Sequence, residues 1–253
     1  MKPGKTEQYL YQKRDEMGAL FFGLIDPIDH PSLEKGIAAA RATAEAGADV
    51  ILVGGSIGAQ GDLLDNIVSG IKKEISVPTI IFPGNIATIS KHADAIYFMS
   101  LLNSREPYWI TLAQTLAAPT IKTLPVEPLP VGYIVIEPGG TVGWVGDANK
   151  IPQSKPHIAS AMALAGQYMG SRFILTDVGS ASPKPVPKEM VKAVSSAIDV
   201  FYIVAGGIRT EKQVRDAVKN GADAIQVGTA IERKGNIQKL IRACHAEGKK
   251  RLR

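Results

Sequence analysis

The sequence has almost no cysteine and no long hydrophobic run. Cys244 is the single cysteine among 253 residues, which excludes an internal disulfide and a metal site built from several thiolates. No apolar run approaches the ~18 residues of a membrane-spanning helix. Residues 1–7 also lack the apolar core of a secretory signal. These features predict a cytoplasmic protein.

The body of the chain has no excess of positive charge. The net charge is +5, yet residues 1–14 carry +3 and residues 232–253 carry +6, so the remainder carries −4. An excess of positive charge confined to the two ends does not form the continuous basic face that nucleic acid binding needs, and we expect no nucleic acid partner. The ends are expected to be a solvated helix and tail, with weak attraction to an anionic membrane surface as the alternative.

Short apolar runs alternate with amphipathic segments along the whole chain. With 45% hydrophobic and 21% charged residues, the chain can bury one large core. Near-continuous apolar runs are typical of strands buried on both faces. Eight such runs lie at residues 19–25, 50–53, 79–82, 95–99, 132–136, 173–176, 201–204 and 224–227. Helical patterns separate most of them, at residues 33–46, 63–74, 109–116, 156–169, 188–197 and 211–220.

This alternation predicts an α/β protein in which residues 1–253 form a single (β/α)8 barrel domain of the TIM type. The segment 83–94, between the third and fourth strands, is short, so we expect the helix there to be reduced or irregular. The alternative is a doubly wound open sheet. It is disfavoured because no GxGxxG motif follows the first strand.

Every predicted strand is followed by polar or glycine-rich residues. In a barrel of this type the chemistry lies at the C-terminal ends of the strands. The polar side chains there, in chain order, are Asp26, Ser56, Asn85, Asn103, Arg105, Glu137, Asp177, Ser180, Arg209 and Thr229. Their collection at one end of the predicted barrel indicates an enzyme.

The last three of these strand ends share a glycine pattern. They read Gly179-Ser180, Gly206-Gly207 and Gly228-Thr229. Glycines leave backbone N–H groups open, and the ends of strands seven and eight are a recurrent phosphate site in barrels. The pattern predicts binding of a phosphate monoester, with simple tight turns as the alternative.

The first two strand ends suit a hard cation. Asp26 offers an anionic oxygen and Ser56 a neutral one. Mg²⁺ binds through few protein ligands and retains water or substrate phosphate oxygens, so a diphosphate would complete the site. The alternative for Asp26 is a turn residue before Pro27.

The run 133–152 begins as an apolar strand and breaks at Glu137-Pro138-Gly139-Gly140. We expect a flexible glycine-rich loop to follow, carrying the side chains Trp144, Asp147, Asn149 and Lys150. A strand that delivers a carboxylate, followed by such a loop, is typical of an active-site lid. The alternative is an ordinary strand and turn.

Four stretches, 24–27, 53–56, 101–110 and 133–152, resemble the geranylgeranylglyceryl phosphate synthase family. The likeness runs from about Leu24 to Ile231, and the glycine-rich stretch 133–152 is its most specific part. Related proteins are the bacterial heptaprenylglyceryl phosphate synthases and a phosphoglycerate prenyltransferase of antibiotic biosynthesis. This chain is more similar to the archaeal lipid enzyme.

The resemblance implies a prenyl transfer that makes the first ether bond of archaeal membrane lipids. Its substrates would be sn-glycerol 1-phosphate and geranylgeranyl diphosphate, with Mg²⁺, and the protein would be a homo-oligomer, dimer or hexamer. By position, Asp26 and Ser56 would bind the metal. The glycerol phosphate site would comprise Leu175, Thr176, Asp177, Val178, Gly179, Ser180, Ala181, Gly206, Gly207, Gly228 and Thr229.

The chain departs from the family at the end of its sixth strand. Where the family often reads Tyr-Leu-Glu-Ala-Gly-Ser-Gly, this chain has an aliphatic Leu175 and the shorter acid Asp177. We expect Asp177 to orient the glycerol hydroxyl, and Asp177 or Glu137 to take its proton. An apolar groove for the prenyl chain has four candidate lining residues, Tyr97, Phe98, Tyr133 and Trp144.

Several alternatives stay open at this point. The donor could be farnesyl or heptaprenyl diphosphate, or the acceptor another alcohol. The protein could instead be a phosphate-handling isomerase or indole-type synthase, which needs a paired acid and base and no lipid groove. A non-enzymatic protein that binds RNA or a membrane through its basic ends is the third alternative.

Overall fold

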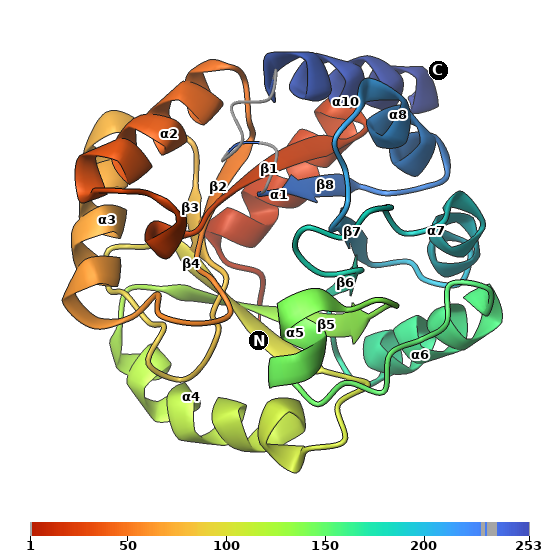
Figure 1. Cartoon of the computed structure of the whole chain (residues 1–253), viewed down its shortest axis with the longest axis horizontal. Helices are drawn as coiled ribbons and strands as arrows, with labels where there is room; N and C mark the ends of the chain where they lie inside the picture. Colours follow the sequence, from red (N-terminus) through yellow and green to blue (C-terminus); the bar gives the residue numbers. More distant parts are fainter. Residues whose placement is uncertain (1, 229–230, 232–236, 253) are drawn as a thin grey trace.

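Eight parallel strands close into a barrel in the order β1-β2-β3-β4-β5-β6-β7-β8 (Figure 1). The computed structural model describes residues 2–228, 231 and 237–252. The strands are β1 Leu20–Ile25, β2 Val50–Val53, β3 Thr79–Ile81, β4 Ala95–Leu101, β5 Glu127–Val135, β6 Phe173–Asp177, β7 Phe201–Ala205 and β8 Ala224–Val227. The (β/α)8 prediction is confirmed.

A ring of helices surrounds the barrel (Figure 1). The ring consists of α2 Leu33–Glu45, α3 Gly61–Glu74, α4 Ala113–Thr123, α6 Pro156–Tyr168, α7 Lys188–Ser195, α8 Glu211–Lys219 and α10 Ile237–Arg251. Helix α1 Lys5–Met17 packs against the N-terminal end of the barrel, and α5 Gly140–Val145 lies beside the end of β5. A 3₁₀ turn covers Pro27–Asp29, and a π-helical turn, Tyr108–Leu112, leads into α4. Within the described residues, no helix is both long enough and apolar enough to span a bilayer.

Side chains alternate between two apolar cores along each strand. Phe22 and Tyr97 belong to the core inside the barrel, whereas Ile51 and Ile96 pack in the core under the helices. Leu10 of α1 joins the inner core from below, where Tyr11 packs edge-on against Phe201. The N-terminal end of the barrel is therefore filled, which leaves the C-terminal end for a site.

The connection between β3 and β4 contains no helix, as predicted. Residues 82–94 form only turns and irregular backbone. An ordinary barrel would place a helix over the outer face of β4 at this point. The absence of this helix leaves the outer face of β4 open between α3 and α4, and part of the cavity described below occupies that space.

Strand β5 begins five residues earlier than the sequence predicted. It pairs with β4 from Glu127, despite Pro128 and Pro130. The carbonyl of Pro130 points toward Arg172, on the β6 side, so both proline nitrogens face that side too. Because β6 pairs with β5 only from Val131, the missing N–H groups remove no hydrogen bond from the sheet.

The helix predicted at 109–116 is present but longer than predicted. It begins as the π-helical turn and continues as α4 to Thr123, through Pro119. An interior proline costs one backbone hydrogen bond. Ala117 and Ile121, one turn apart, nevertheless lie on one face and pack against the outer core.

Candidate active site

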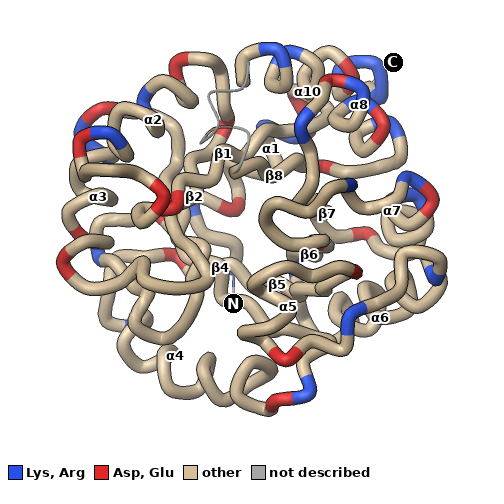
Figure 2. Tube along the Cα trace, viewed as in Figure 1, with Lys and Arg blue, Asp and Glu red and all other residues tan. Residues whose placement is uncertain are grey.

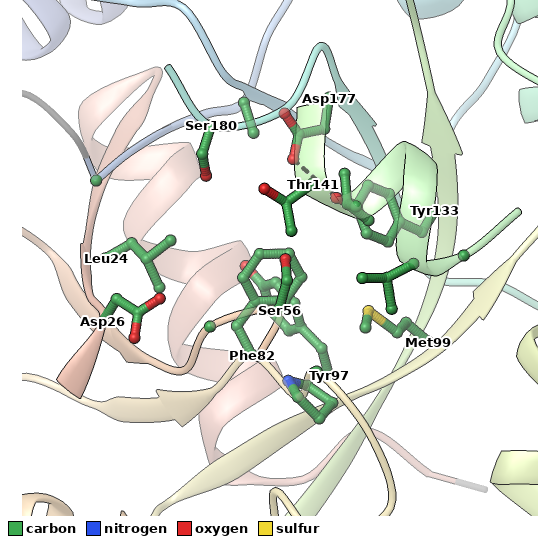
Figure 3. Close-up of a pocket in the computed structure, with 18 of the residues that line it drawn as sticks. Leu24, Asp26, Ser56, Phe82, Tyr97, Met99, Tyr133, Thr141, Asp177 and Ser180 are labelled. Carbon is green, nitrogen blue, oxygen red and sulfur yellow. Dashed lines mark hydrogen bonds between the residues drawn. The ribbon is translucent and has the colours of Figure 1, made fainter. Parts of the chain in front are cut away.

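A cavity of about 530 Å³ opens at the C-terminal end of the barrel (Figure 3). Its volume lies within the range of small-molecule sites, ~300–1,000 Å³. Residues from the ends of β1, β2, β4, β6, β7 and β8 line it, together with residues from α4 and α5. It has a polar mouth over the barrel and an apolar arm that runs outward beneath α4.

Asp26 and Ser56, the predicted metal ligands, both line the mouth (Figure 3). Asp26 Oδ1 accepts a hydrogen bond of 3.2 Å from the N–H of Ile28. The carboxylate rests on Gly55, where a Cβ would overlap Asp26 Oδ2. Glycine at position 55 is therefore required for this placement.

Burial raises the pKa of Asp26 to about 6, with the Ile28 hydrogen bond opposing the shift and nearby Asp29 adding to it. The described residues contain no cluster of three His, Cys, Asp or Glu side chains. One carboxylate and one hydroxyl facing an open cavity nevertheless match the ligands of Mg²⁺ that shares its coordination with substrate phosphates.

Backbone around two glycines forms another side of the mouth. Gly206 and Gly207 have φ angles of +82° and +67°. A Cβ at Gly206 would crowd Asp177 Oδ1, and one at Gly207 would overlap the carbonyl of Lys184. Among the described residues, nothing accepts a hydrogen bond from either glycine N–H. We call Gly206 and Gly207, with the adjacent Ser180, Ala181 and Gly228 of the cavity lining, the glycine cradle.

Asp177 lies at the boundary between the cavity and the barrel interior. Its Oδ2 accepts 2.8 Å from the Tyr133 hydroxyl, and its Oδ1 accepts 2.6 Å from the Gly179 N–H. Burial raises the pKa of Asp177, and the two hydrogen bonds oppose that shift. Burial and the Asp177 charge raise the pKa of Tyr133 well above its usual value, so Tyr133 remains a donor.

Only part of the predicted glycerol phosphate set reaches the cavity. Leu175 faces the inner core, Val178 packs in the outer one, and the Thr176 hydroxyl lies 2.8 Å from the Tyr202 hydroxyl. Strand alternation explains Thr176 and Val178, because Asp177 points inward while its two neighbours point outward. Leu175 also points inward, but it lies one step deeper in the barrel and is fully buried. Gly179 does not line the cavity, and its N–H is used by Asp177. Thr229 lies outside the described residues.

Glu137, the second predicted catalytic acid, does not line the cavity. Its side chain is exposed, and its carbonyl accepts 2.7 Å from Gln153 Nε2. The Ile136 N–H still donates 2.8 Å to the Asp177 carbonyl of β6, but the Glu137 N–H donates 3.0 Å to the carbonyl of Ile151, which lies outside the barrel strands. The inward alternation of β5 therefore stops before position 137.

The glycine-rich segment after β5 is not the open loop that was predicted. It contains α5, beside the end of β5 in Figure 1. The helical period turns Thr141, Val142 and Val145 toward the cavity, while Trp144 is 82% exposed.

The polar residues of this segment also lie outside the cavity. Asp147 Oδ1 is 3.9 Å from Arg105 Nη1, and Asn149 Oδ1 accepts 3.2 Å from Arg105 Nη2. The Lys150 stem packs on Gly139. The segment predicted to form a lid therefore contributes Thr141, Val142 and Val145 to the cavity wall, and not the four side chains that were predicted.

The apolar arm occupies the gap left by the helix missing between β3 and β4. It is lined by Ile86, Ile89, Ile96, Phe98, Ala117 and Ile121. A second hollow of about 400 Å³ shares Ile86, Ile89 and Ala117 with it and extends outward to Leu116 and Leu124. Of the predicted groove residues, Tyr97, Phe98 and Tyr133 line the cavity and Trp144 does not.

Sequence reasoning gave no role to several polar residues of the cavity, among them Arg209 and Gln226. Arg209, half-buried, lies beside the glycine cradle with Nη1 3.4 Å from the Gly207 carbonyl. It is the one Lys or Arg among the lining residues that the structure describes. Gln226 lines the floor of the cavity. The sequence feature that could have identified it is a single polar residue within an otherwise apolar strand.

Residues 14–247 match the model of the PcrB family. The chain belongs to the PcrB family. Among its curated relatives, the geranylgeranylglyceryl phosphate synthase of Thermococcus kodakarensis is 53% identical over 94% of both chains. That of Pyrococcus abyssi is 53% identical over 96% of both. The family resemblance inferred from the sequence is confirmed.

Solved structures agree with this membership. The (S)-3-O-geranylgeranylglyceryl phosphate synthase of Thermoplasma acidophilum, solved in complex with its substrate sn-glycerol-1-phosphate, has a TM-score of 0.90 at 36% identity. The alignment covers 98% of this PcrB family member and 100% of that chain. A thiamine phosphate pyrophosphorylase of Pyrococcus furiosus, at 13% identity and a TM-score of 0.58, shares the fold alone.

Proposed function

We propose that this protein is a Mg²⁺-dependent prenyltransferase that joins geranylgeranyl diphosphate to the 3-hydroxyl of sn-glycerol 1-phosphate. The observation that carries the proposal is a single cavity that combines the glycine cradle, the Asp26 carboxylate and the apolar arm. The curated relatives support the proposal, because proteins named geranylgeranylglyceryl phosphate synthase match nearly the whole chain.

The acceptor binds in the glycine cradle. The N–H groups of Gly206 and Gly207, which have no acceptor among the described residues, are suited to a phosphate monoester, since backbone donors without a side chain can approach it closely. Arg209 supplies the positive charge beside them. Ser180 adds a hydroxyl donor at the cavity edge.

The diphosphate of the donor binds beside Asp26 and Ser56. These two residues would hold Mg²⁺, which when bound neutralises charge on the leaving diphosphate. The pKa of Asp26, raised by burial, is a sign that its charge lacks a counterion within the described protein. A cation at this position would remove that penalty.

The prenyl chain lies in the apolar arm. Burying ten methylene-sized groups contributes about 8 kcal/mol, enough to anchor a long isoprenoid without polar contacts. The adjoining outer hollow extends the space beyond Ala117. Farnesyl and heptaprenyl donors remain the alternatives for chain length.

The protein's own residues act mainly by positioning. The bond between the allylic carbon and diphosphate breaks, and the glycerol 3-oxygen forms the new bond to that carbon. Asp177, fixed by Tyr133 and Gly179, orients the acceptor hydroxyl and receives its proton. We assign no part of this step to Glu137, because it lies outside the cavity lining.

The rival functions fit less well. A small-phosphate isomerase or synthase has no use for an apolar arm more than one side chain deep. For RNA binding, the Lys and Arg residues are spread over the outer helices rather than gathered on one face (Figure 2). Arg14 and Arg251 contact Asp223 within the protein.

The setting of the enzyme is also part of the proposal. We place it in the cytoplasm as a homo-oligomer. The exposed Lys249 and Lys250, at the end of α10, provide weak attraction to an anionic membrane surface.

The test is turnover of labelled sn-glycerol 1-phosphate with prenyl diphosphates from C15 to C35, with Mg²⁺ and with EDTA. The proposal predicts a prenyl ether product, fastest with the C20 donor and abolished by EDTA. No product with any donor in Mg²⁺ would overturn it.

A further inference from the structure

The buried amide oxygen of Gln226, Oε1, has no hydrogen-bond partner among the described residues. Gln226 lies on β8, is 3% exposed and lines the floor of the cavity. Buried polar side-chain atoms are bonded in the large majority of cases, and an unpaired one is costly. Such an atom facing a substrate cavity indicates that its partner arrives with the substrate.

The sheet register places Gln226 and Asp177 on the two strands that flank Ala205 of β7. Asp177 pairs with Ala205, and Ala205 pairs with Gln226. Neighbouring strands lie about 4.8 Å apart, so the two Cα atoms are separated by roughly 10 Å across β7. All three side chains belong to the cavity lining. Because Ala205 carries only a methyl group, the space between the two longer side chains is open to the cavity.

The space above Ala205 is bounded by three different groups. The next residues in the chain, Gly206 and Gly207, are the centre of the glycine cradle. Asp177 already accepts two hydrogen bonds, and a carboxylate has about four lone-pair sites, so it can accept another. Gln226 Oε1 is a neutral acceptor on the far side.

We propose that Gln226 accepts a hydrogen bond from the 2-hydroxyl of the glycerol phosphate and thereby selects its stereochemistry. The inference rests on the proposed function. In this assignment the phosphate of sn-glycerol 1-phosphate binds in the glycine cradle, its 3-hydroxyl binds Asp177 and its 2-hydroxyl binds Gln226 Oε1. The enantiomer, sn-glycerol 3-phosphate, cannot make all three contacts at once and would leave Gln226 Oε1 without that donor. Three contacts around one stereocentre are what discrimination between enantiomers requires.

The test substitutes Gln226→Met, which keeps the shape of the side chain and removes its hydrogen bonds. Values of kcat/KM are measured for three acceptors: sn-glycerol 1-phosphate, sn-glycerol 3-phosphate and 3-hydroxypropyl phosphate, which lacks the 2-hydroxyl. Thr79→Val is the matched control, because Thr79 Oγ1 is also buried and unpartnered but does not line the cavity.

The substitution is expected to lower kcat/KM for sn-glycerol 1-phosphate about tenfold to a hundredfold. The value for 3-hydroxypropyl phosphate should change less than about twofold, and the preference for sn-glycerol 1-phosphate over its enantiomer should fall. Gln226→Glu, which retains an acceptor, should keep part of that preference. Equal losses with all three acceptors, or an unchanged preference between enantiomers, would overturn the assignment.

Equilibrium binding of the same three acceptors separates this inference from the proposed function. If wild-type protein shows no prenyl transfer but binds the 1-phosphate selectively, and Gln226→Met removes that selectivity, the assignment of Gln226 stands and the proposed function fails. If prenyl transfer occurs with selectivity unaffected by Gln226→Met, the proposed function stands and the assignment fails. Thermal unfolding of each variant verifies that it is folded.

Discussion

Tyr133 on β5 donates its hydroxyl hydrogen to Asp177 on β6 across 2.8 Å, and both side chains are buried. Together with the Gly179 N–H, this contact fixes the carboxylate close to its own strand. The shorter acid at this position, compared with the family's Glu, is thus fully held by its neighbours. In the proposed mechanism the acceptor hydroxyl approaches this fixed carboxylate, and the glycine cradle and Gln226 position the rest of the glycerol phosphate.

Replacing Asp177 with Asn should lower kcat about a hundredfold, since a well-placed electrostatic group contributes on the order of 3 kcal/mol to catalysis. Burial raises the pKa of Asp177 above 3.8. The carboxylate is therefore present above this raised pKa and is lost as the pH falls through it.

The pH profile of kcat measures this directly, at saturating substrates and Mg²⁺. Wild-type protein should lose activity on the acid side at a higher pH than an ordinary aspartate would cause, and the Asn variant should lack that limb. An identical acid limb in both proteins would rule out Asp177 as its origin.

Asp26→Asn should reduce turnover at least a hundredfold and leave the fold intact. The amide oxygen can still accept from Ile28 and still fits over Gly55, while the negative charge for a cation is gone. Because burial already disfavours that charge, the midpoint of thermal unfolding should not fall. Activity is measured across a Mg²⁺ titration, and wild-type turnover at any Mg²⁺ concentration would exclude Asp26 from the metal site.

Arg209→Met should raise KM for glycerol phosphate about tenfold to a hundredfold, by loss of one charge-assisted hydrogen bond of about 1.5–3 kcal/mol. KM for the prenyl diphosphate should not change. Arg209 is a cleaner probe than Gly207, since a Cβ at Gly207 would collide with the Lys184 carbonyl. Equal increases in both KM values would contradict the separation of the two anion sites.

Ala117→Phe should shorten the prenyl chains that the enzyme accepts. Ala117 lies where the apolar arm meets the outer hollow, so a ring there closes the passage. Turnover with the C20 donor should fall more than tenfold, because several methylene-sized contacts of about 0.8 kcal/mol each are lost, whereas the C10 and C15 donors should be retained. Thr115→Phe, at an exposed position of the same helix outside both hollows, is the matched control. An unchanged chain-length profile would place the prenyl chain elsewhere.

The barrel could be predicted because its strands are buried on both faces. Runs such as Val50–Val53 and Phe201–Ala205 consist of apolar or aromatic residues throughout. The polar residues that follow the strands lie at the C-terminal end of the barrel in any fold of this type, so their position did not depend on the exact register. The early part of β5 could not be predicted, because Pro128 and Pro130 are tolerated only where the neighbouring strand is missing.

The site was predictable in position but not in every side chain. Which members of 175–181 face the cavity depends on the register of β6 within the closed sheet. Helix α5 contains Gly140 and Gly143, and glycine has a low helix propensity. The helix is stabilised instead by the packing of Val142 and Val145 at the cavity. A role for Gln226 could be inferred only from the sheet register, which places Ala205 between Gln226 and Asp177.

The most direct measurement is a crystal structure with Mg²⁺, sn-glycerol 1-phosphate and geranylgeranyl thiolodiphosphate, a donor analogue that ionises slowly. The account predicts the glycerol phosphate in the glycine cradle, the diphosphate and metal beside Asp26 and Ser56, and the prenyl chain beneath α4, all in one cavity. A prenyl chain bound outside the apolar arm, or a diphosphate remote from Asp26, would contradict it.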